Sequence, residues 1–279
     1  MSELQQEAVG YQTRSLIRAL AILDSFGPDE PTLSVKDLHE RLGVPKPTIS
    51  RLASVLEKHG LLRGAGHGYR LGPKTFELGA LFARQYGLQS AARPPLEAMA
   101  RETSQTSSLA VLSSASVVYL IVARPLRPIH HVTDAGSREL AHLTGLGKAL
   151  LSTLEPAAVE RLLGPEPLES QTPHTLTDYA SLHEELELTR NRGYALDEEE
   201  FALGLRCVAI QLELPRVGLA AISVSGPAAD YASSDIPAFV EILRQTAAEL
   251  EAAFAQAAEF SFSPAKLGEQ LPRVDVDSR

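Results

Sequence analysis

The sequence predicts two domains: a small helical N-terminal domain with a β-hairpin, and a larger α+β domain with a largely antiparallel sheet. Three observations predict this fold class. The chain has 279 residues, which is enough for two hydrophobic cores at about 100–200 residues per domain. Hydrophobic residues make up 44% and charged residues 22% of the chain, an ordinary balance for globular proteins. Helical apolar spacing dominates before residue 75, whereas strand and helix patterns are mixed after residue 93.

The composition and the cysteine content exclude several classes of protein. The balance does not fit disordered, collagenous or disulfide-stapled chains, and the single cysteine, Cys207, cannot form an intramolecular disulfide. The N-terminal residues MSELQQEAVGYQ are acidic and polar and show no signal segment, so we expect the protein in the cytoplasm. The most apolar stretch, residues 109–123, is interrupted by serines and is shorter than the ~18 apolar residues that span a bilayer. No membrane helix is expected.

Positive charge is concentrated in one segment of an acidic chain. The net charge is −9, yet residues 1–85 carry 11 Lys and Arg against 9 Asp and Glu. Within residues 31–74 the counts are 8 basic and 3 acidic. Such local positive charge is typical of a nucleic-acid-binding domain, although a solvated helix face has the same composition. The motifs must therefore decide between the two.

The first helix is expected over residues 14–26. Its apolar residues fall along one side, which we expect to face the core: Leu16, Ile17, Leu20, Leu23 and Phe26. Gly27 and Pro28 directly after this stretch end the helix.

Two further short helices are joined by a tight turn. The second helix follows Ser34, which forms an approximate capping box with Asp37, and it ends at Gly43. The third helix begins near Pro47, because proline is tolerated in the first turn, and it runs to Gly60.

The third helix has an apolar inner face and a polar outer face. Its apolar residues recur at helical spacing: Ile49, Leu52, Ala53 and Leu56. The residues left pointing outward all carry donors for phosphates or base edges: Lys46, Thr48, Ser50, Arg51 and Ser54. We expect this face to enter the major groove of DNA.

A glycine-rich turn over residues 64–68 separates two short runs with strand character. A β-hairpin after such a helix resembles a wing, which lies along the DNA backbone or minor groove, so Arg63, His67 and Arg70 are candidate phosphate contacts. Short helix pairs with a glycine turn also occur in many other helical proteins. The ordered set of three helices, a basic face and a hairpin favours a winged helix-turn-helix domain.

The rest of the chain is expected to form a linker, a second domain and a tail. A helix over residues 73–89 is predicted to break at Arg93-Pro94-Pro95, before another helix begins at Leu96. Strands are expected at 107–112, 117–123, 206–214 and 218–225, and helices at 147–154, 156–163, 178–192 and 236–254, which fits α+β. The predicted boundaries are 1–75 for the winged domain, 76–92 for a helical linker, 93–260 for the second domain and 261–279 for a flexible tail.

Two glycines, Gly145 and Gly147, stand at the start of a predicted helix. Glycines there let the backbone approach a ligand, and the unpaired N–H groups with the helix dipole favour an anion such as a small carboxylate. A phosphate-binding loop is not indicated, because the glycine spacing is wrong and Ala149 stands where Ser or Thr would bind magnesium. A tight turn packed on the sheet remains the alternative.

With these motifs in place, the chain resembles the IclR family of bacterial transcriptional regulators over nearly its whole length. The resemblance is carried by LSVKDLHERLGVPKPTISRLASVLEKHGLLR (33–63), LTGLGKALL (143–151), RGYALDEEEFALGLRCVAIQL (192–212) and AAISVSGP (220–227). Pro47 departs from the family, which more often has a small polar residue there. The resemblance therefore leaves undecided one potential backbone or base contact between the third helix and DNA. The resemblance implies that the second domain is a GAF-like effector-binding domain.

The resemblance also implies the walls of an effector pocket. Backbone amides of the glycine turn, an acidic residue after the Arg-Gly-Tyr strand, the cysteine and two serines of the last strand match Gly145, Leu146, Asp197, Cys207, Ser223 and Ser225. Ser223 and Ser225 share one face of a strand, as do Leu205 and Cys207. Taken singly, Cys207 could be a small core residue, Asp197 a helix cap and the serines edge hydroxyls.

An enzyme or a metalloprotein is not expected. No G-x-S-x-G elbow occurs, and a thiol inside an apolar strand is more often inert than activated. Glu198, Glu199 and Glu200 are expected to form the solvated first turn of a helix rather than an acid/base pair. The spacing of His130, His131 and His142 matches no metal motif. No cofactor and no metal are expected.

Together these observations predict a ligand-responsive DNA-binding regulator, for which repression is favoured over activation. It would sense a small or aromatic carboxylate, control a catabolic operon, and dimerise through its N-terminal domain on a near-palindromic operator. Pairing of dimers through the second domains stays open. The alternative is a small-molecule sensor that acts through protein partners, with the basic N-terminal face as a docking surface.

Overall fold

A computed structural model describes residues 3–27, 29–125, 133–231 and 234–260 of the chain. The chain forms two compact units, Met1–Gln85 and Tyr86–Arg279. The predicted fold class is confirmed: the first unit contains a winged helix-turn-helix, and the second is α+β with an antiparallel sheet. The predicted tail, residues 261–279, lies outside the described residues.

The elements of the first unit follow the predicted order. They are α1 (Glu3–Asp24), β1 (Leu33–Ser34), α2 (Val35–Leu42), α3 (Lys46–Lys58), β2 (Leu62–Ala65), β3 (Gly68–Leu71) and α4 (Pro73–Gln85). The strands form a small antiparallel sheet in the order β1-β3-β2. Helices α1, α2 and α3 surround a common core with Leu38, Ile49 and Leu62 among its buried residues.

Local signals define the helix-turn-helix. Ser34 Oγ accepts a hydrogen bond from the Asp37 N–H at 3.2 Å, and the Asp37 carboxylate accepts one from the Ser34 N–H at 2.8 Å, so the predicted capping box is present. Gly43 ends α2 with a φ of 63°, a left-handed conformation that suits glycine. Pro47 lies in the first turn of α3. These signals place the turn between α2 and α3 where the sequence predicted it.

Helix α1 differs from the prediction in both its extent and its buried face. It begins at Glu3, well before residue 14, and Ile22 is fully buried among the α1 side chains that the structure describes. Leu16, Ile17 and Leu20 are 61%, 59% and 52% exposed, so the predicted inner face was wrong for these three residues. The core side of α1 also includes Ala19, Leu23 and Phe26, which pack partly buried against the cluster.

The connection between the units also differs from the prediction. Helix α4 ends at Gln85 rather than at residue 89, and none of its side chains is buried. Its four large apolar residues are between 41% and 78% exposed: Phe76, Leu78, Leu81 and Phe82. The prolines after Arg93 do not break a helix but occupy the first turn of a new one, where the missing N–H is harmless.

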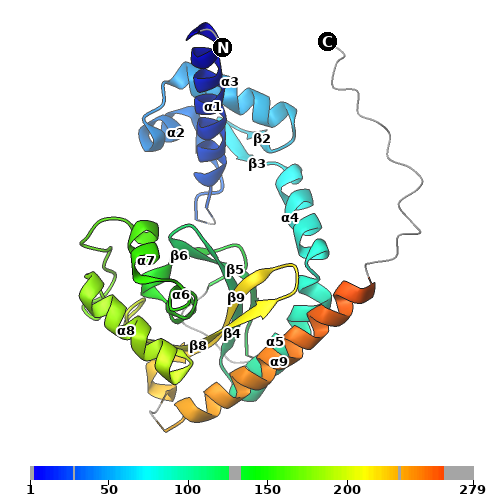
Figure 1. The fold of residues 1–279 in the computed structure, drawn as a ribbon. Helices are drawn as coiled ribbons and strands as arrows, with labels where there is room; N and C mark the ends of the chain where they lie inside the picture. Colours follow the sequence, from blue (N-terminus) through cyan, green and yellow to red (C-terminus); the bar gives the residue numbers. More distant parts are fainter. Residues whose placement is uncertain (1–2, 28, 126–132, 232–233, 261–279) are drawn as a thin grey trace. The chain divides into compact units, whose positions relative to one another are not determined.

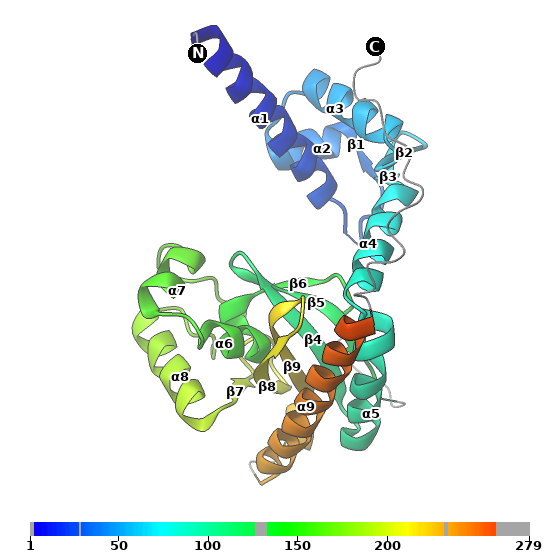
Figure 2. The same ribbon diagram turned by 45° about the vertical axis from the view of Figure 1, so that its right-hand side comes forward.

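The second unit is a six-stranded sheet with helices on both faces. Its elements are η1 (Leu88–Ala92), α5 (Arg93–Thr103), β4 (Thr106–Ser113), β5 (Ser116–Ala123), β6 (Arg138–Leu140), η2 (Ala141–Leu143), α6 (Gly145–Leu151), α7 (Pro156–Leu163), α8 (Tyr179–Arg192), β7 (Ala195–Glu198), β8 (Leu205–Leu214), β9 (Gly218–Pro227), η3 (Ala228–Asp230) and α9 (Ile236–Phe260). All strand pairs are antiparallel, in the order β6-β5-β4-β9-β8-β7. Figures 1 and 2 show α5 and α9 side by side on one face, with α6, α7 and α8 over the other.

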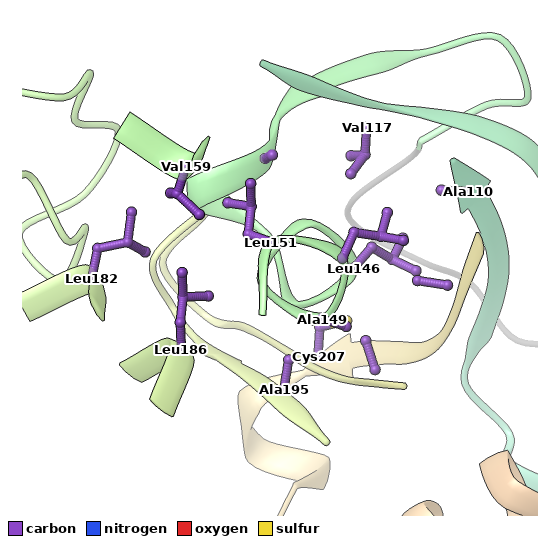
Figure 3. Packing of buried hydrophobic residues seen from close by; sticks show 14 of the residues in the cluster. Ala110, Val117, Leu146, Ala149, Leu151, Val159, Leu182, Leu186, Ala195 and Cys207 are labelled. Carbon is purple, nitrogen blue, oxygen red and sulfur yellow. The ribbon is translucent and has the colours of Figure 1, made fainter. Parts of the chain in front are cut away.

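Helix α6 lies against the centre of the sheet, and all of its residues are buried. Figure 3 shows Leu146, Ala149 and Leu151 of α6 packed among Cys207 and Ala195 of the neighbouring strands. A Cβ on Gly147 would lie 2.0 Å from the Ala141 carbonyl oxygen, so glycine is required where the helix begins. The glycines therefore set the close packing of α6, as the alternative interpretation of this turn predicted.

The four predicted strands of the second unit are present to within one or two residues at their ends. Three short strands, β1, β6 and β7, were not predicted, because two to four residues carry too little alternation to be recognised. Helix α6 begins two residues earlier and ends three residues earlier than predicted. Asp197 lies within β7, and not after a strand that contains Arg192-Gly193-Tyr194.

Candidate functional site

The outer face of α3 carries the polar side chains that the sequence predicted. Lys46, Ser50, Arg51 and Ser54 are exposed, and Thr48 is half-buried. The buried side chains of this helix are those predicted to face the core: Ile49, Leu52, Ala53 and Leu56. The outer face therefore presents cationic and hydroxyl donors to solvent, while the opposite face of α3 is packed in the core.

The β2–β3 hairpin places further cations beside this helix. Arg63 and Arg70 are directly opposite each other in the antiparallel pair, so both side chains leave the same face of the hairpin. His67 is exposed in the two-residue turn next to Gly66, whose φ of 60° suits such a turn. Arg70 Nε donates to Thr32 Oγ1 at 2.5 Å, which orients its guanidinium. Like charges on opposite residues repel, and a bound anion would relieve this repulsion.

A cavity of about 170 Å³ opens in the second unit between the sheet and α6. Six of the seven residues predicted for an effector pocket line it: Leu146, Asp197, Leu205, Cys207, Ser223 and Ser225. The strand register explains this, since Cys207 pairs with both Asp197 and Ser225 across neighbouring strands. Residues far apart in the sequence thus face one space.

Gly145 is not among the residues that line the cavity. A Cβ at this position would come within 3.1 Å of Cys207 Sγ, so glycine lets α6 begin close to this side chain. The Gly147 N–H donates to the side chain of the N-cap residue Thr144 at 3.0 Å. Of the two residues predicted to cradle an anion through their amides, Leu146 therefore lines the cavity and Gly145 does not.

Several wall residues were missed by the sequence-based prediction. They come from β4, β5, the segments before β6 and α6, the loop after β7 and the end of β9: Thr106, Ser108, Tyr119, Thr133, Thr144, Phe201, Leu203, Gly204, Gly226 and Pro227. The hydroxyl groups supply hydrogen-bond donors, while Phe201 and Leu203 supply an apolar wall. Only the sheet order places β4 and β5 beside β9, and no local signal in the sequence reveals that order.

Asp197 is the ionisable carboxyl among the described residues of the cavity wall and is 2% exposed. Its Oδ1 accepts hydrogen bonds from the N–H groups of Glu200 at 2.8 Å and Phe201 at 3.4 Å. Burial, together with the nearby Glu200 carboxylate, raises the pKa of Asp197 to about 7. This side chain can therefore change its charge near neutral pH.

The acidic run after Asp197 does not form the first turn of a helix, so that prediction was wrong. Glu200 lies in the loop between β7 and β8, is buried, and forms an ion pair with the fully buried Lys148 of α6. Burial raises the pKa of Glu200, which the Lys148 cation opposes. Lys148 Nζ also lies 3.8 Å from Glu185 of α8, which in turn pairs with Arg192 at 2.6 Å. A chain of charges thus extends from the cavity wall into α8.

Cys207 is buried and lines the cavity. Burial raises the pKa of its thiol to about 12, and the Asp197 carboxylate contributes to the increase. The neutral thiol is a weak donor and a poor nucleophile. The side chain therefore shapes the cavity and is unsuited to nucleophilic attack.

The described residues contain no group of three or more His, Cys, Asp or Glu side chains that could hold a metal ion. His142 is buried with its Nε2 2.8 Å from the Glu169 carbonyl, and burial lowers its pKa. His130 and His131 lie outside the described residues. Among the helices that the structure describes, none is long and apolar enough to cross a bilayer.

Comparisons with known proteins identify both units. A family model for the IclR helix-turn-helix domain matches residues 15–65, and a model for the C-terminal region of bacterial IclR transcriptional regulators matches residues 81–252. The chain is 35% identical over 240 residues to the HTH-type transcriptional regulator BhcR of Paracoccus denitrificans, covering 85% of this chain and 86% of that protein. It is 29% identical to the transcriptional repressor IclR of Escherichia coli, covering 87% and 90% of the two chains.

The fold is also shared with solved structures. A putative IclR transcriptional regulator from Silicibacter sp. has a TM-score of 0.78 and 26% identity, with 86% of this chain and 96% of that chain covered. The family models, the sequence relatives and the fold agree over both units. The chain therefore belongs to the IclR family of bacterial transcriptional regulators, whose members bind DNA.

Proposed function

We propose that this regulator is a repressor of a catabolic operon and that a small or aromatic carboxylate controls its binding to a near-palindromic operator. One observation carries the proposal: an exposed face of cationic and hydroxyl donors lies on one unit, and a cavity lined by hydroxyl groups and apolar side chains lies on the other. The ligand would have to bind one arrangement of the regulator better than another, since only differential affinity carries a signal.

The outer face of α3 would read base edges, while the hairpin would hold phosphates. Support comes from the exposure of Lys46, Ser50, Arg51 and Ser54, with Thr48 half-buried at the same face. Arg63, His67 and Arg70 would contact the backbone, because the two arginines leave one face of the hairpin. Arginine is well suited to guanine, since its guanidinium donates two parallel hydrogen bonds.

Arg51→Ala is expected to weaken operator binding by about 1–3 kcal/mol, because it removes a base contact. Fluorescence anisotropy of a labelled operator fragment at fixed salt measures this change. Arg161→Ala is the matched control, because Arg161 is an exposed arginine on α7 of the other unit. Equal operator affinity of the Arg51 variant and the wild type would remove Arg51 from the reading face.

The alternative is a sensor that acts through protein partners, and salt dependence separates the two functions. Phosphate contacts make the logarithm of the affinity fall linearly with the logarithm of salt concentration, and they give measurable binding to any duplex. A protein-docking face would ignore an unrelated duplex even at low salt. The same anisotropy titration, repeated with a random duplex over a salt series, distinguishes them.

The cavity supports a small organic acid as the effector. Hydroxyl groups of Ser108, Ser223 and Ser225 can donate to a carboxylate, and Leu146 and Phe201 can pack against a short chain or ring. Calorimetric titration with benzoate and acetate tests this class, because the two probes differ in apolar size but share the carboxylate.

A homodimer formed through the N-terminal unit fits the exposed apolar side chains of α1 and α4. Leu16, Ile17 and Leu20 on α1 and Phe76 on α4 are all more than half exposed. Several large exposed apolar side chains on two helices are typical of an interaction site. A two-fold dimer would present two copies of α3 to a near-palindromic operator.

A further inference from the structure

The cavity that we assign to the effector has an acidic side chain in its wall, although the proposed ligand is itself an anion. Asp197 is the single carboxyl among the described residues that line it, and no Lys, Arg or His of the described chain does so. A carboxylate ligand would therefore enter a space whose wall holds an anion and offers no cation in direct contact. Hydroxyl donors and the first-turn N–H of Leu146 on α6 would have to offset the repulsion between the two carboxylates.

The charged and titratable groups around Asp197 come from four directions. Glu200 follows it in the chain, and Lys148 of α6 pairs with Glu200 while its charge opposes the increase in the pKa of Asp197. Cys207 on β8 and Tyr119 on β5 are neutral, since burial raises the pKa of both. The Lys148 cation is already paired with Glu200 and lies 3.8 Å from Glu185, so it does not neutralise Asp197 alone.

The balance of this network favours one additional proton. Three carboxylates (Asp197, Glu200 and Glu185) share two cations (Lys148 and Arg192). One proton on a carboxyl makes the group neutral before any ligand enters. We propose that a carboxylate effector binds in this cavity together with one proton, which the side chain of Asp197 carries in the complex. The inference rests on the proposed effector class.

The geometry assigns the proton to one oxygen of Asp197. Within the described part of the chain, both hydrogen bonds to its side chain end on Oδ1, from the N–H groups of Glu200 and Phe201. A proton on Oδ2 leaves these bonds intact and turns the group from an acceptor into a donor. The neutral carboxyl then donates its O–H to the ligand carboxylate, with the proton taken up from solvent.

The expected signature is an affinity that depends on pH in one direction. Burial raises the pKa of Asp197 to about 7 in the free protein, and a bound anion would raise it further. Below this pH the group is already protonated, so the dissociation constant for benzoate is expected to be nearly constant. Above it the dissociation constant is expected to increase about tenfold per pH unit, since binding must then take up one proton. The benzoate carboxyl itself stays ionised throughout this range, because its pKa lies near that of other carboxyls, about 4.

Isothermal titration calorimetry of the full chain with benzoate, and in parallel with acetate, measures the dissociation constant and the number of protons taken up on binding. The dissociation constant is followed from about pH 6 to about pH 8.5, across the Asp197 titration. At about pH 8, titrations in two buffers of different ionisation enthalpy count the protons, and close to one per bound ligand is expected. This measurement needs no variant, so it decides the proposal even if a substitution impairs folding.

Asp197→Asn and a neighbouring control assign the proton to its residue. In D197N the dissociation constant is expected to be independent of pH. Glu198→Gln is the control, because Glu198 adjoins Asp197 on β7 but has a 56% exposed side chain, and it is expected to keep the wild-type dependence. Residual pH dependence in D197N, or wild-type binding that releases or takes up no proton, overturns the linkage while leaving the effector class intact. Failure of both probes to bind at every pH overturns the effector class and the linkage together.

Discussion

At the scale of single residues, Lys148 holds the buried charges together. Its side chain is fully buried and pairs with Glu200, which itself has only 9% of its side-chain surface exposed. Removing one partner of a buried pair leaves an uncompensated charge, which costs far more than the pair contributes. An exposed pair such as Lys36–Glu40 contributes little, because water screens it.

Lys148→Met is therefore expected to lower the free energy of unfolding by about 3–5 kcal/mol. Lys36→Met is the control and is expected to cost less than about 1 kcal/mol, since the Lys36 side chain is 69% exposed. Urea unfolding followed by circular dichroism measures both. Adding Glu200→Gln to Lys148→Met should recover part of the loss, and equal destabilisation by the two lysine variants would contradict the role of the buried pair.

The same residues show where sequence reasoning ends. Consecutive acidic residues normally form a solvated surface, so nothing local distinguishes Glu200 from Glu198 and Glu199. The burial of Glu200 arises from the path of the loop, which Thr172 and Thr175 hold through hydrogen bonds of 2.7 Å to the carbonyls of Glu199 and Glu200. Asp197 was predicted through family resemblance, whereas the ion pair beside it depends on contacts across more than fifty residues.

At the scale of secondary structure, short-range signals gave reliable predictions and long-range ones did not. Three signals act within a few residues: the capping box of α2, its terminal Gly43 and the first-turn proline of α3. The local sequence is therefore enough to predict where these helices begin and end. Helix α1 is different, because it has apolar residues on two sides. Periodicity identifies an apolar face but does not tell which of two faces the core will cover.

Ser34→Ala is expected to lower the stability of the N-terminal unit by about 1 kcal/mol, because it leaves the Asp37 N–H without its capping oxygen. Ser34→Asp is the matched control, since aspartate is an equally good cap and should keep most of the stability. Hydrogen exchange of the α2 amides measures the local loss. Unchanged protection of α2 in the alanine variant would show that the cap contributes nothing here.

At the scale of the whole molecule, the sheet order decides what meets in the cavity. Strands β7, β8 and β9 bring Asp197, Cys207 and Ser225 into line, and these were predictable from short sequence blocks with a family match. Tyr119 on β5 joins them because the order β5-β4-β9-β8 folds a distant hairpin into the same sheet. That order is a property of the complete fold, so the hydroxyl groups that β4 and β5 contribute to the cavity were not predictable.

Assembly is the remaining whole-molecule property, and the apolar surface of the first unit makes it testable. Phe76 is 78% exposed on α4, so replacing it with glutamate should not disturb the fold of the subunit. In the homodimer proposed above, a charge there opposes burial against a second copy, so Phe76→Glu is expected to shift the protein from dimer to monomer and to weaken binding to the full operator. Sedimentation velocity measures the first change and anisotropy the second.

Leu188→Glu is the control for this substitution, since Leu188 is 49% exposed on α8 of the other unit. It introduces the same charge in place of an exposed apolar side chain without touching α1 or α4. A dimer that persists in the Phe76 variant would assign self-association to another surface. Loss of the dimer in both variants would show that the second unit also contributes to dimerisation. A dimer formed through the first unit alone would not be affected by a charge on α8.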